Sequence, residues 1–510
     1  MSRKLTPSEN RRAWLYAALI VLALLACAGA AVLHSGGTLA GAERVYLPEE
    51  GPLVREAAAG LDSITVDAVF DPDSRLLTAT QVMTLQNPSG QALDTLVLRS
   101  YSGAYLQEDT SPAATDELFA ASYGSAFSPG GLALESVRIG TDEAAFSWQD
   151  EAHTVLALPV QWAPYETLRV TLRYQVRIPQ CASRFGVSEG IYALGNVFPT
   201  LALWQSGAWR DDPYAAIGDP FLTACANWTV RITVPRGYTV ASTGYAEPVF
   251  SGDTATYTLS ARAVRDFALV ISDSFACASG MAGDVLVAAY ARKESSARQM
   301  LTYARAALEC YEQHFGPYAY PTLTLAEVSF PFGGMEYPRM VMIASQLMEQ
   351  RALDLEMTCA HEVAHQWWYA MVGSDSFQQA WQDESLCEYS VLDYFGQVYG
   401  PDTREDVAFL RIETAMRITV PRGVTPGSPI DYFQDLNEYS TVVYCRGAAL
   451  WRALETHLGK DALDAALRRY AEEYRFGFAT RDDLTRLLSD EAGQDLSALV
   501  SDYLDTYLSN

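Results

Sequence analysis

Two histidines and a glutamate at the start of the run HEVAHQWWYAMVGSDSFQQAWQDE, residues 361–384, have the types and spacing of a metal site. Residues four apart lie on one face of a helix, so His361 and His365 would present their imidazoles about one turn apart, which suits Zn²⁺. Glu362 shares that face and is placed to take a proton from a water on the metal. The pattern predicts a zinc site with an adjacent general base, and a chance match on a solvated helix is the alternative.

The residues around this pattern predict a helix from Leu353 to Val372. Apolar side chains cover most of its circumference, and the polar exceptions are Thr358, His361, Glu362 and His365. Ionisable groups inside an apolar helix cost free energy unless they have a partner. A metal ion is the simplest partner.

Two histidines leave a catalytic zinc one protein ligand short. No histidine follows His365 until His457, so a carboxylate must complete the site. Glu384, separated from His365 by eighteen residues, is the best-placed candidate if a second helix folds back against the first. Glu388 lies one turn further along and would accept the free ring N–H of a zinc-bound imidazole, unless it is a solvated helix residue.

The motif HExxH, eighteen residues and then a glutamate in W-x-x-E resembles the M1 family of zinc aminopeptidases, a branch of the gluzincins with a thermolysin-like catalytic domain. The family has a G-x-M-E-N segment upstream, and residues 333–337 read GGMEY. It has a tyrosine followed by x-[KR]-G downstream, and residues 444–447 read YCRG. Three motifs in this order make the match specific, and it extends more loosely from about Asp62 to the C-terminus.

The resemblance implies a role for each matching residue. One Zn²⁺ per chain would be held by His361, His365 and Glu384, with Glu362 as general base and Glu388 behind the ligands. Tyr444 would stabilise the oxyanion, although alone it is an ordinary tyrosine at a helix start. Gly333, Gly334, Met335 and Glu336 would bind a peptide substrate along an edge strand, with Glu336 on a free α-ammonium group; alone, the glycine pair is equally a turn.

Two departures from the family pattern leave other functions open. Tyr337 replaces the usual asparagine, and no segment of the strand-rich region is recognisable as a second polar clamp for the amine. A zinc endopeptidase or oligopeptidase on the same scaffold is therefore the second hypothesis. The third is a non-catalytic extracellular binding module that keeps the fold.

Composition bounds the fold class and the partners. The chain has 510 residues, of which 49% are apolar, so it can bury large cores in two or three domains. A formal charge of −26 argues against nucleic acid as a partner. Eight cysteines lie singly without a CxxC pair, which favours buried apolar packing over a disulfide framework. Nothing in the composition indicates an oligomeric state.

The N-terminus predicts a single-pass membrane anchor. Residues 1–12 carry four basic side chains and one acid, and residues 13–33 are 21 uncharged positions, enough to cross a bilayer. This asymmetry places a cytoplasmic tail before the span and the catalytic part outside the cell membrane. A cleavable signal peptide ending near residues 28–30 and a poor lipoprotein box at residues 24–27 are alternatives, and both also export the catalytic part.

The rest of the chain predicts an α+β multidomain protein. Residues 34–61 are Gly- and Ala-rich and indicate a linker, and residues 62–275 contain period-two runs that predict an all-β sandwich or saddle domain. A long aromatic loop at residues 198–220 is either an active-site wall or interdomain packing. The resemblance makes residues 276–510 the thermolysin-like α/β catalytic domain.

Within that domain we expect strands at 286–292 and 323–330, a helix capped by Ser295 or Ser296 that runs to Phe315, and helices at 389–398, 446–458, 461–474 and 481–489. Only 66 residues follow Tyr444, so we expect the large C-terminal helical domain of many family members to be missing.

Overall fold

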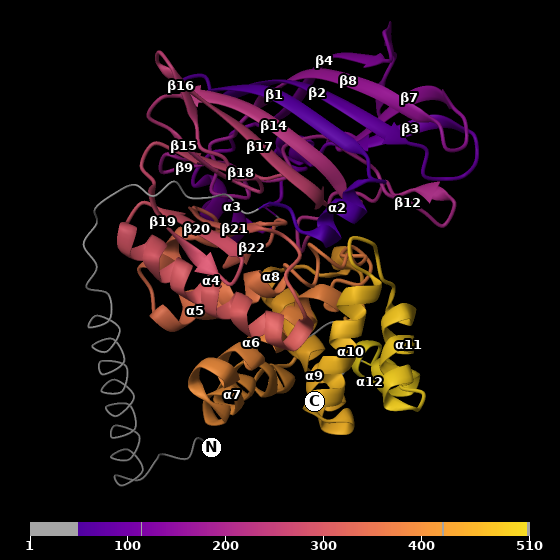
Figure 1. Cartoon of the computed structure of the whole chain (residues 1–510), viewed down its shortest axis with the longest axis vertical. Coiled ribbons are helices and arrows are strands. Elements are labelled where there is room, and N and C mark those ends of the chain that lie inside the picture. Colours follow the sequence, from indigo (N-terminus) through magenta and orange to yellow (C-terminus); the bar gives the residue numbers. More distant parts are fainter. Residues whose placement is uncertain (1–48, 114, 421–422, 507–510) are drawn as a thin grey trace. The chain divides into compact units, whose positions relative to one another are not determined.

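Strands dominate the first half of the chain and helices the second half. The computed structural model describes residues 49–113, 115–420 and 423–506, all within the unit Pro48–Asn510. In this unit the strands of the first half lie at the top of Figure 1, and most helices lie in the lower half. The expected mixed α+β class, with a strand-rich N-terminal part and a helical C-terminal part, is confirmed.

The described residues contain no helix of the length and hydropathy that crossing a bilayer requires. The predicted tail (1–12), anchor (13–33) and first part of the linker lie outside them.

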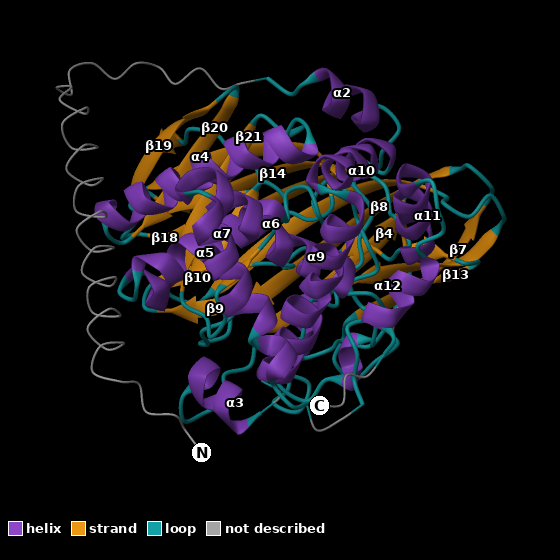
Figure 2. Cartoon of the chain, turned by 90° about the horizontal axis from the view of Figure 1, so that it is seen from below, coloured by secondary structure: helices purple, strands orange, loops and turns teal. Residues whose placement is uncertain are grey.

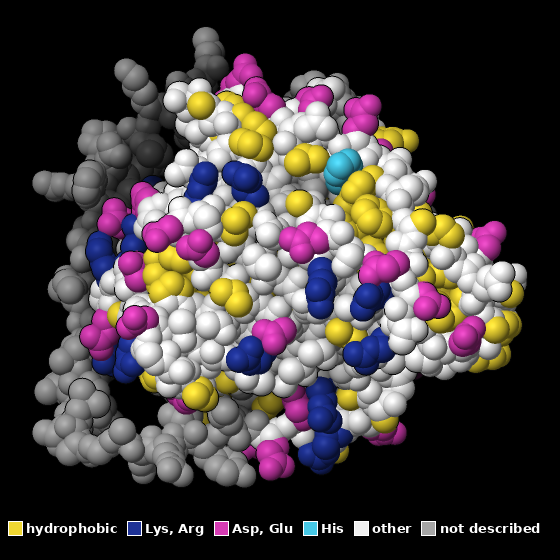
Figure 3. Space-filling model, turned by 90° about the horizontal axis from the view of Figure 1, so that it is seen from above, with side chains coloured by type: hydrophobic (Ala, Val, Ile, Leu, Met, Phe, Trp, Pro, Cys, Tyr) yellow, Lys and Arg dark blue, Asp and Glu magenta, His cyan; other side chains and the backbone are white. Residues whose placement is uncertain are grey.

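The largest sheet has eight strands, and one of its faces is solvated. In β1 the side chains alternate between buried and exposed, which is the period-two pattern of a sheet covered on one side only. Figure 3 looks onto the strand-rich side, where basic and acidic side chains are interspersed between small apolar groups. In this sheet β1 and β14 pair in parallel, and all other neighbouring strands pair antiparallel. The strand order is β16 (Val249–Ser251), β17 (Thr254–Val264), β14 (Ala226–Pro235), β1 (Ser63–Asp71), β2 (Leu76–Gln86), β8 (Thr167–Arg177), β4 (Gly131–Ile139) and β5 (Asp142–Glu143).

Three smaller sheets complete the strand-rich part. The first has the order β15 (Thr239–Ser242), β18 (Leu269–Ser272), β10 (Ile191–Leu194) and β9 (Phe185–Ser188). The second has the order β11 (Thr200–Leu201), β3 (Leu93–Arg99), β7 (Val155–Trp162) and β6 (Ser147–Trp148). The third is the hairpin β12 (Trp204–Gln205) and β13 (Ala208–Trp209).

A five-stranded sheet begins the second half, and its three central strands are buried on both faces. Its order is β19 (Ala276–Ala282), β20 (Val285–Ala291), β21 (Thr322–Val328), β23 (Met340–Ala344) and β22 (Gly334–Met335). Every residue of β20, β21 and β23 is buried, as expected for parallel strands covered on both sides. Helix α4 (Glu294–Phe315) contacts β20 and β21, and β10 and β15 also contact β21. Strand β22 is left at the edge.

Helices form a layer over the strands in the view from below (Figure 2). Besides α4 they are α2 (Pro52–Ala58), α3 (Asp116–Tyr123), α5 (Ala352–Ala364), α6 (Trp381–Tyr399), α7 (Pro401–Ala408), α8 (Leu436–Tyr439), α9 (Gly447–Leu458), α10 (Lys460–Glu473), α11 (Arg481–Ala492) and α12 (Ser497–Leu504). Short 3₁₀ segments lie at Tyr101–Tyr105, Ser345–Met348, Ala415–Arg417 and Ile430–Tyr432, and π-helical turns lie at Phe409–Glu413 (η3) and Ser440–Arg446 (η6).

Several expectations of local structure were wrong. The region expected to be all-β contains α3, which Thr115 caps by accepting from Leu118 N, and the expected linker contains α2. Helix α4 begins one residue before Ser295, with Lys293 at its N-cap, so neither expected serine caps it. Helix α12 was not expected. Of the seven cysteines described, six are buried, and Cys277 is exposed.

Candidate active site

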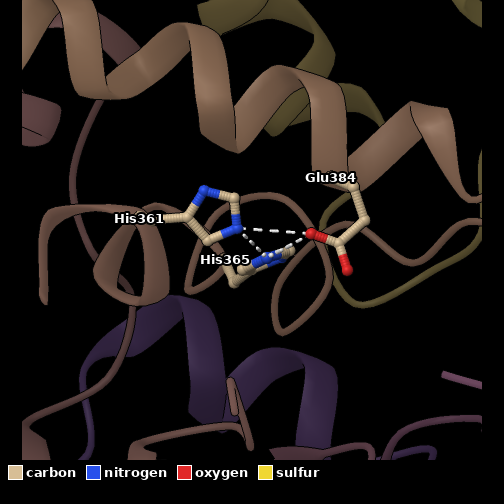
Figure 4. Close-up of side chains that lie close together, drawn as sticks. All are labelled: His361, His365 and Glu384. Atoms are coloured by element: carbon tan, nitrogen blue, oxygen red, sulfur yellow. Dashed lines mark hydrogen bonds and ion pairs between the residues drawn. The ribbon is translucent and has the colours of Figure 1, made fainter. Parts of the chain in front are cut away.

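The side chains of His361, His365 and Glu384 converge on one point (Figure 4). Their three facing atoms form a nearly equilateral triangle: His361 Nε2 lies 3.2 Å from His365 Nε2 and 3.3 Å from Glu384 Oε2, and His365 Nε2 lies 3.2 Å from the same oxygen. An ion with tetrahedral bonds of about 2.0–2.1 Å separates its ligand atoms by about 3.3–3.4 Å. The triangle therefore fits Zn²⁺, and helix α6 does fold back against α5 as the spacing required.

Helix α5 ends at Ala364, so the expected helix from Leu353 to Val372 was wrong beyond that point. His365 is the C-cap residue, and Tyr369 has a φ of 133°, which no helix allows. The sequence did not reveal this end because the residues beyond it are mostly apolar and are buried in the turn as they would be in a helix. The turn brings the carbonyl of Trp368 to 3.0 Å from His365 Nδ1, so that nitrogen carries the proton and Nε2 is left free for a metal.

Glu388 lies behind His361. Its Oε2 is 3.5 Å from His361 Nδ1, which leaves the Nε2 atom of that ring facing the other two ligands. Arg411 holds the same carboxylate with two hydrogen bonds, from Nε to Oε1 at 2.6 Å and from Nη2 to Oε2 at 2.9 Å. Burial opposes ionisation of Glu388, but the charge of Arg411 outweighs it and keeps the pKa of the carboxyl well below its usual value.

Glu362 lies beside the triangle and close to Gly334. A Cβ added to Gly334 would overlap the carboxylate of Glu362, so this glycine leaves the space that the side chain occupies. Glu362 Oε2 is buried without a hydrogen-bond partner, as a base that awaits a water molecule would be. Burial is the main cause that raises its pKa, to about 7. A carboxyl with a pKa in this range can exchange a proton at neutral pH.

Tyr444 lies in the π-helical turn η6 rather than at the start of an α-helix. Its ring stacks on His361 with centroids 5.5 Å apart, and its hydroxyl donates to Glu384 Oε1 at 2.6 Å. π-Helical turns inside α-helices occur frequently at functional sites. The geometry brings Tyr444 to the rim of the candidate metal site, on the side of the third ligand.

A pocket of about 220 Å³ opens beside these groups. Glu336 lines it together with Asp219 and Glu384, and the three carboxylates each place an oxygen within 4.8 Å of the other two. Burial, and then the charge of Asp219, raise the pKa of Glu336 well above its usual value. Three acids at this distance favour a positively charged ligand that would neutralise them.

Asp219 and Arg184 are pocket residues that the sequence did not identify. They form an ion pair, and the guanidinium of Arg184 also lies over the rings of Phe221 and Phe332. Asp219 belongs to the aromatic loop at residues 198–220, and since Gly218 and Asp219 line the pocket, this loop is a wall of the site. The sequence indicated Asp219 only as an acidic residue in a loop that was a possible active-site wall. Asp211 and Asp212 lie in the same loop, so the sequence could not single out Asp219.

Tyr337 points away from the pocket. It is fully buried, and its hydroxyl donates to Asn196 Oδ1 at 2.6 Å, while Asn196 in turn donates to the carboxylate of Asp266. A Cβ on Gly195 would overlap the Tyr337 ring, so a glycine makes room for the larger residue. The departure from the family pattern is thus accommodated in the strand-rich part, and Tyr337 is not among the residues that line the pocket.

Comparisons with known proteins locate the similarity in the helical half. A family model described as "Peptidase family M1 domain" matches residues 300–503. The tricorn protease-interacting factor F2 of Thermoplasma acidophilum is 29% identical over 224 residues, which are 40% of this chain and 27% of that protein. Aminopeptidase N of Lactobacillus delbrueckii subsp. lactis is 28% identical over 248 residues, 43% of this chain and 28% of that protein. The chain thus spans little more than a quarter of the length of these relatives.

The fold is similar over a longer stretch. The crystal structure of an M1 zinc metallopeptidase from Deinococcus radiodurans superposes with a TM-score of 0.62 over 88% of this chain and 93% of that one, at 15% identity. At this identity the likeness shows the shared fold.

Proposed function

Residues 300–503 give this chain a peptidase family M1 domain, and on that premise we propose that it is a zinc-dependent aminopeptidase that removes N-terminal residues from peptides. The observation that carries the proposal is the direct contact between a metal-ligand triangle and an acidic pocket. Glu384 belongs to both groups of side chains, so a ligand in the pocket lies next to the metal position.

His361, His365 and Glu384 would hold one zinc ion per chain. A bound zinc supplies Lewis acidity and lowers the pKa of a coordinated water to about 7. The buried, unpartnered oxygen of Glu362 supports this assignment, because it needs a polar neighbour that the protein itself does not provide.

Glu362 would transfer the proton in the reaction. Its carboxylate takes a proton from the attacking water and gives it to the leaving amine. Gly334 has no Cβ that would overlap the carboxylate of Glu362. It lies on the edge strand β22, whose outer side would be free to pair with an extended peptide.

Tyr444 would donate a hydrogen bond to the oxyanion that develops on the substrate carbonyl. Its hydroxyl donates to Glu384 Oε1 at 2.6 Å, so the donor is already held at the edge of the metal site. A donor that exchanges this bond for one to the oxyanion acts mainly in the transition state, which is where such a contact accelerates a reaction.

The acidic pocket supports exopeptidase activity. An α-ammonium group has three N–H donors and one positive charge, and Asp219, Glu336 and Glu384 offer converging acceptors with an excess of negative charge. Asp219 thus supplies the polar clamp that could not be identified in the sequence. An internal stretch of a peptide has no such charge, so the same pocket would disfavour endopeptidase cleavage.

The deciding experiment compares matched substrates with and without a free amine. Purified protein is treated with chelator and reloaded with Zn²⁺, and then assayed on a panel of chromogenic amino-acid amides and on their N-acetylated forms. We expect zinc-dependent turnover of the free amines only. Equal rates on both forms would indicate an endopeptidase or oligopeptidase, and stoichiometric zinc without turnover would indicate a binding module.

We also propose the cellular arrangement that the N-terminal sequence suggests. Residues 13–33 would anchor the protein in the cell membrane with residues 1–12 in the cytoplasm, and a β domain (62–275) and a catalytic domain (276–510) would lie outside. The support is the uncharged run and the basic residues before it. Protease added to intact cells should degrade the catalytic part, and washing membranes at high salt should not release the protein. Full protection of the catalytic part in intact cells, together with release of the protein at high salt, would contradict this arrangement.

A further inference from the structure

Arg411 reaches from the π-helical turn η3 to helix α6 and binds Glu388 through both carboxylate oxygens, at 2.6 and 2.9 Å. The side chain of Glu388 is 2% exposed and that of Arg411 is 38% exposed, so the arginine closes the outer side of a buried acid. A guanidinium that donates two parallel hydrogen bonds fixes the plane of the carboxylate as well as its position.

The fixed plane determines which oxygen meets the metal ligand. Oε2 of Glu388 accepts from Arg411 and also lies 3.5 Å from His361 Nδ1. His361 Nε2 then faces His365 and Glu384. If Glu388 rotated, the ring of His361 would lose the acceptor that holds its orientation and its tautomer, as is typical of carboxylates behind metal-bound histidines.

We propose that Arg411 is a positioning residue for the metal centre, acting through Glu388 to keep the His361 ring aligned for Zn²⁺. The inference rests on the proposed function only in requiring that the site binds zinc. Arg411 does not touch the candidate metal position, and its effect passes through one carboxylate.

The π-helical turn accounts for the direction of Arg411. Thr414 N donates to Phe409 O at 3.1 Å, a bond between residues five apart that marks the π geometry. Within this turn Phe409 and Leu410 are exposed, whereas Ile412 is buried and Arg411 reaches α6. The turn therefore presents one cation to the buried acid from a segment that is otherwise at the surface.

The experiment measures zinc affinity rather than turnover. The full chain and its Arg411→Gln, Arg411→Lys and Arg417→Gln variants are titrated with Zn²⁺ against a chromophoric chelator at constant pH. We expect Arg411→Gln to weaken zinc binding by about 10- to 100-fold. Arg411→Lys keeps the charge but not the fork and should fall between that variant and the parent. Arg417→Gln, on the neighbouring surface with an ion pair to Glu413, should stay within about twofold of the parent.

A second pair of variants tests whether Arg411 acts through Glu388. Glu388→Gln should weaken zinc binding, and the double variant Arg411→Gln/Glu388→Gln should bind zinc no more weakly than Glu388→Gln alone. If the double variant bound zinc more weakly than Glu388→Gln by the factor that Arg411→Gln causes alone, the proposal would be overturned. The absorption bands of the Co²⁺-substituted protein should shift in Arg411→Gln and not in Arg417→Gln.

The outcomes separate the two proposals. A parent chain that binds no zinc would remove the proposed function itself. If the parent binds zinc and Arg411→Gln binds it equally tightly, only the role of Arg411 is overturned. If Arg411→Gln does not fold, as judged by near-ultraviolet circular dichroism, Arg411→Lys carries the same comparison.

Discussion

Gly334 and Glu362 share a space that admits only one side chain. A Cβ on Gly334 would overlap the Cγ, Cδ and Oε1 atoms of Glu362, whereas a Cβ on Gly333 would find its nearest neighbours, two atoms of Thr358, at 3.5 Å. The glycine pair therefore has an asymmetric role. The second glycine leaves the space that Glu362, the proposed general base, occupies. A methyl group on the first glycine would make only ordinary contacts with Thr358.

This asymmetry predicts different effects of two alanine substitutions. Gly334→Ala should lower kcat/KM by about 100-fold, since a displacement of about 1 Å at a reacting group costs that much. Gly333→Ala is the matched control and should lose less than about tenfold. Steady-state kinetics on a free-amine substrate, with zinc content measured in parallel, provide the comparison. Equal losses in the two variants would show that the contact with Glu362 does not decide the effect.

Removal of the proposed general base should separate chemistry from metal binding. Glu362→Gln keeps the shape of the side chain but cannot accept the proton, so kcat should fall by about 10²- to 10⁴-fold. Zinc stoichiometry should remain that of the parent, because Glu362 is not one of the three atoms of the ligand triangle. Undiminished turnover would contradict its assignment as the base.

The metal triangle could be predicted from sequence because helix periodicity and ligand chemistry constrain it. Two imidazoles one turn apart and a carboxylate on the next helix follow from spacing. Periodicity gave no sign of the end of α5 at Ala364, because the following residues are buried in the turn and remain apolar.

Asp219 and Arg411 could not be predicted for a different reason. Both lie in irregular segments, and each meets its partner only through tertiary contacts with a distant part of the chain. The role of Tyr337 also depends on a tertiary contact that the sequence does not reveal. This residue departs from the family pattern beside the expected substrate site, but its hydroxyl donates to Asn196 in the strand-rich part.

That network predicts a change in stability without a change in substrate binding. Tyr337→Phe leaves Asn196 Oδ1 buried without its donor, which should lower the free energy of unfolding by about 1–3 kcal/mol. KM should be unchanged because the hydroxyl faces away from the pocket. Tyr165→Phe, at a residue that is 73% exposed, should change stability by less than about 0.5 kcal/mol. Urea unfolding followed by tryptophan fluorescence measures both, and a raised KM in Tyr337→Phe would restore the doubt about substrate alignment.

The ion pair between Asp219 and Arg184 predicts how the amine site responds to loss of its acid. Asp219→Asn removes one acceptor charge and leaves the partly buried guanidinium of Arg184 near the proposed position of the substrate ammonium. We expect kcat/KM for free-amine substrates to fall by about 10- to 100-fold, mainly through KM. Asp212→Asn is the matched control, since Asp212 lies in the same loop, pairs with Arg210 at 2.8 Å and is comparably exposed. A similar loss in the control would point to disturbance of the loop.

Asp62 provides a pH-dependent prediction outside the active site. Burial raises its pKa to about 6, although it accepts a hydrogen bond from Gln86 N at 2.8 Å. A carboxyl whose pKa is higher in the folded state than its ordinary value of 3.8 binds more protons when folded. Its stabilising contribution is therefore complete below about pH 3.8 and is lost as the pH rises through about 6.

Asp62→Asn stays neutral across this range and should keep the contribution that the wild type loses. Relative to the wild type, the variant should gain up to about 2 kcal/mol of unfolding free energy between pH 4 and pH 7. Urea unfolding at half-unit pH intervals measures the difference. The opposite result would be a variant that loses unfolding free energy relative to the wild type as the pH rises. Folding would then favour the ionised form of Asp62, and the pKa of this acid would be lowered in the folded state.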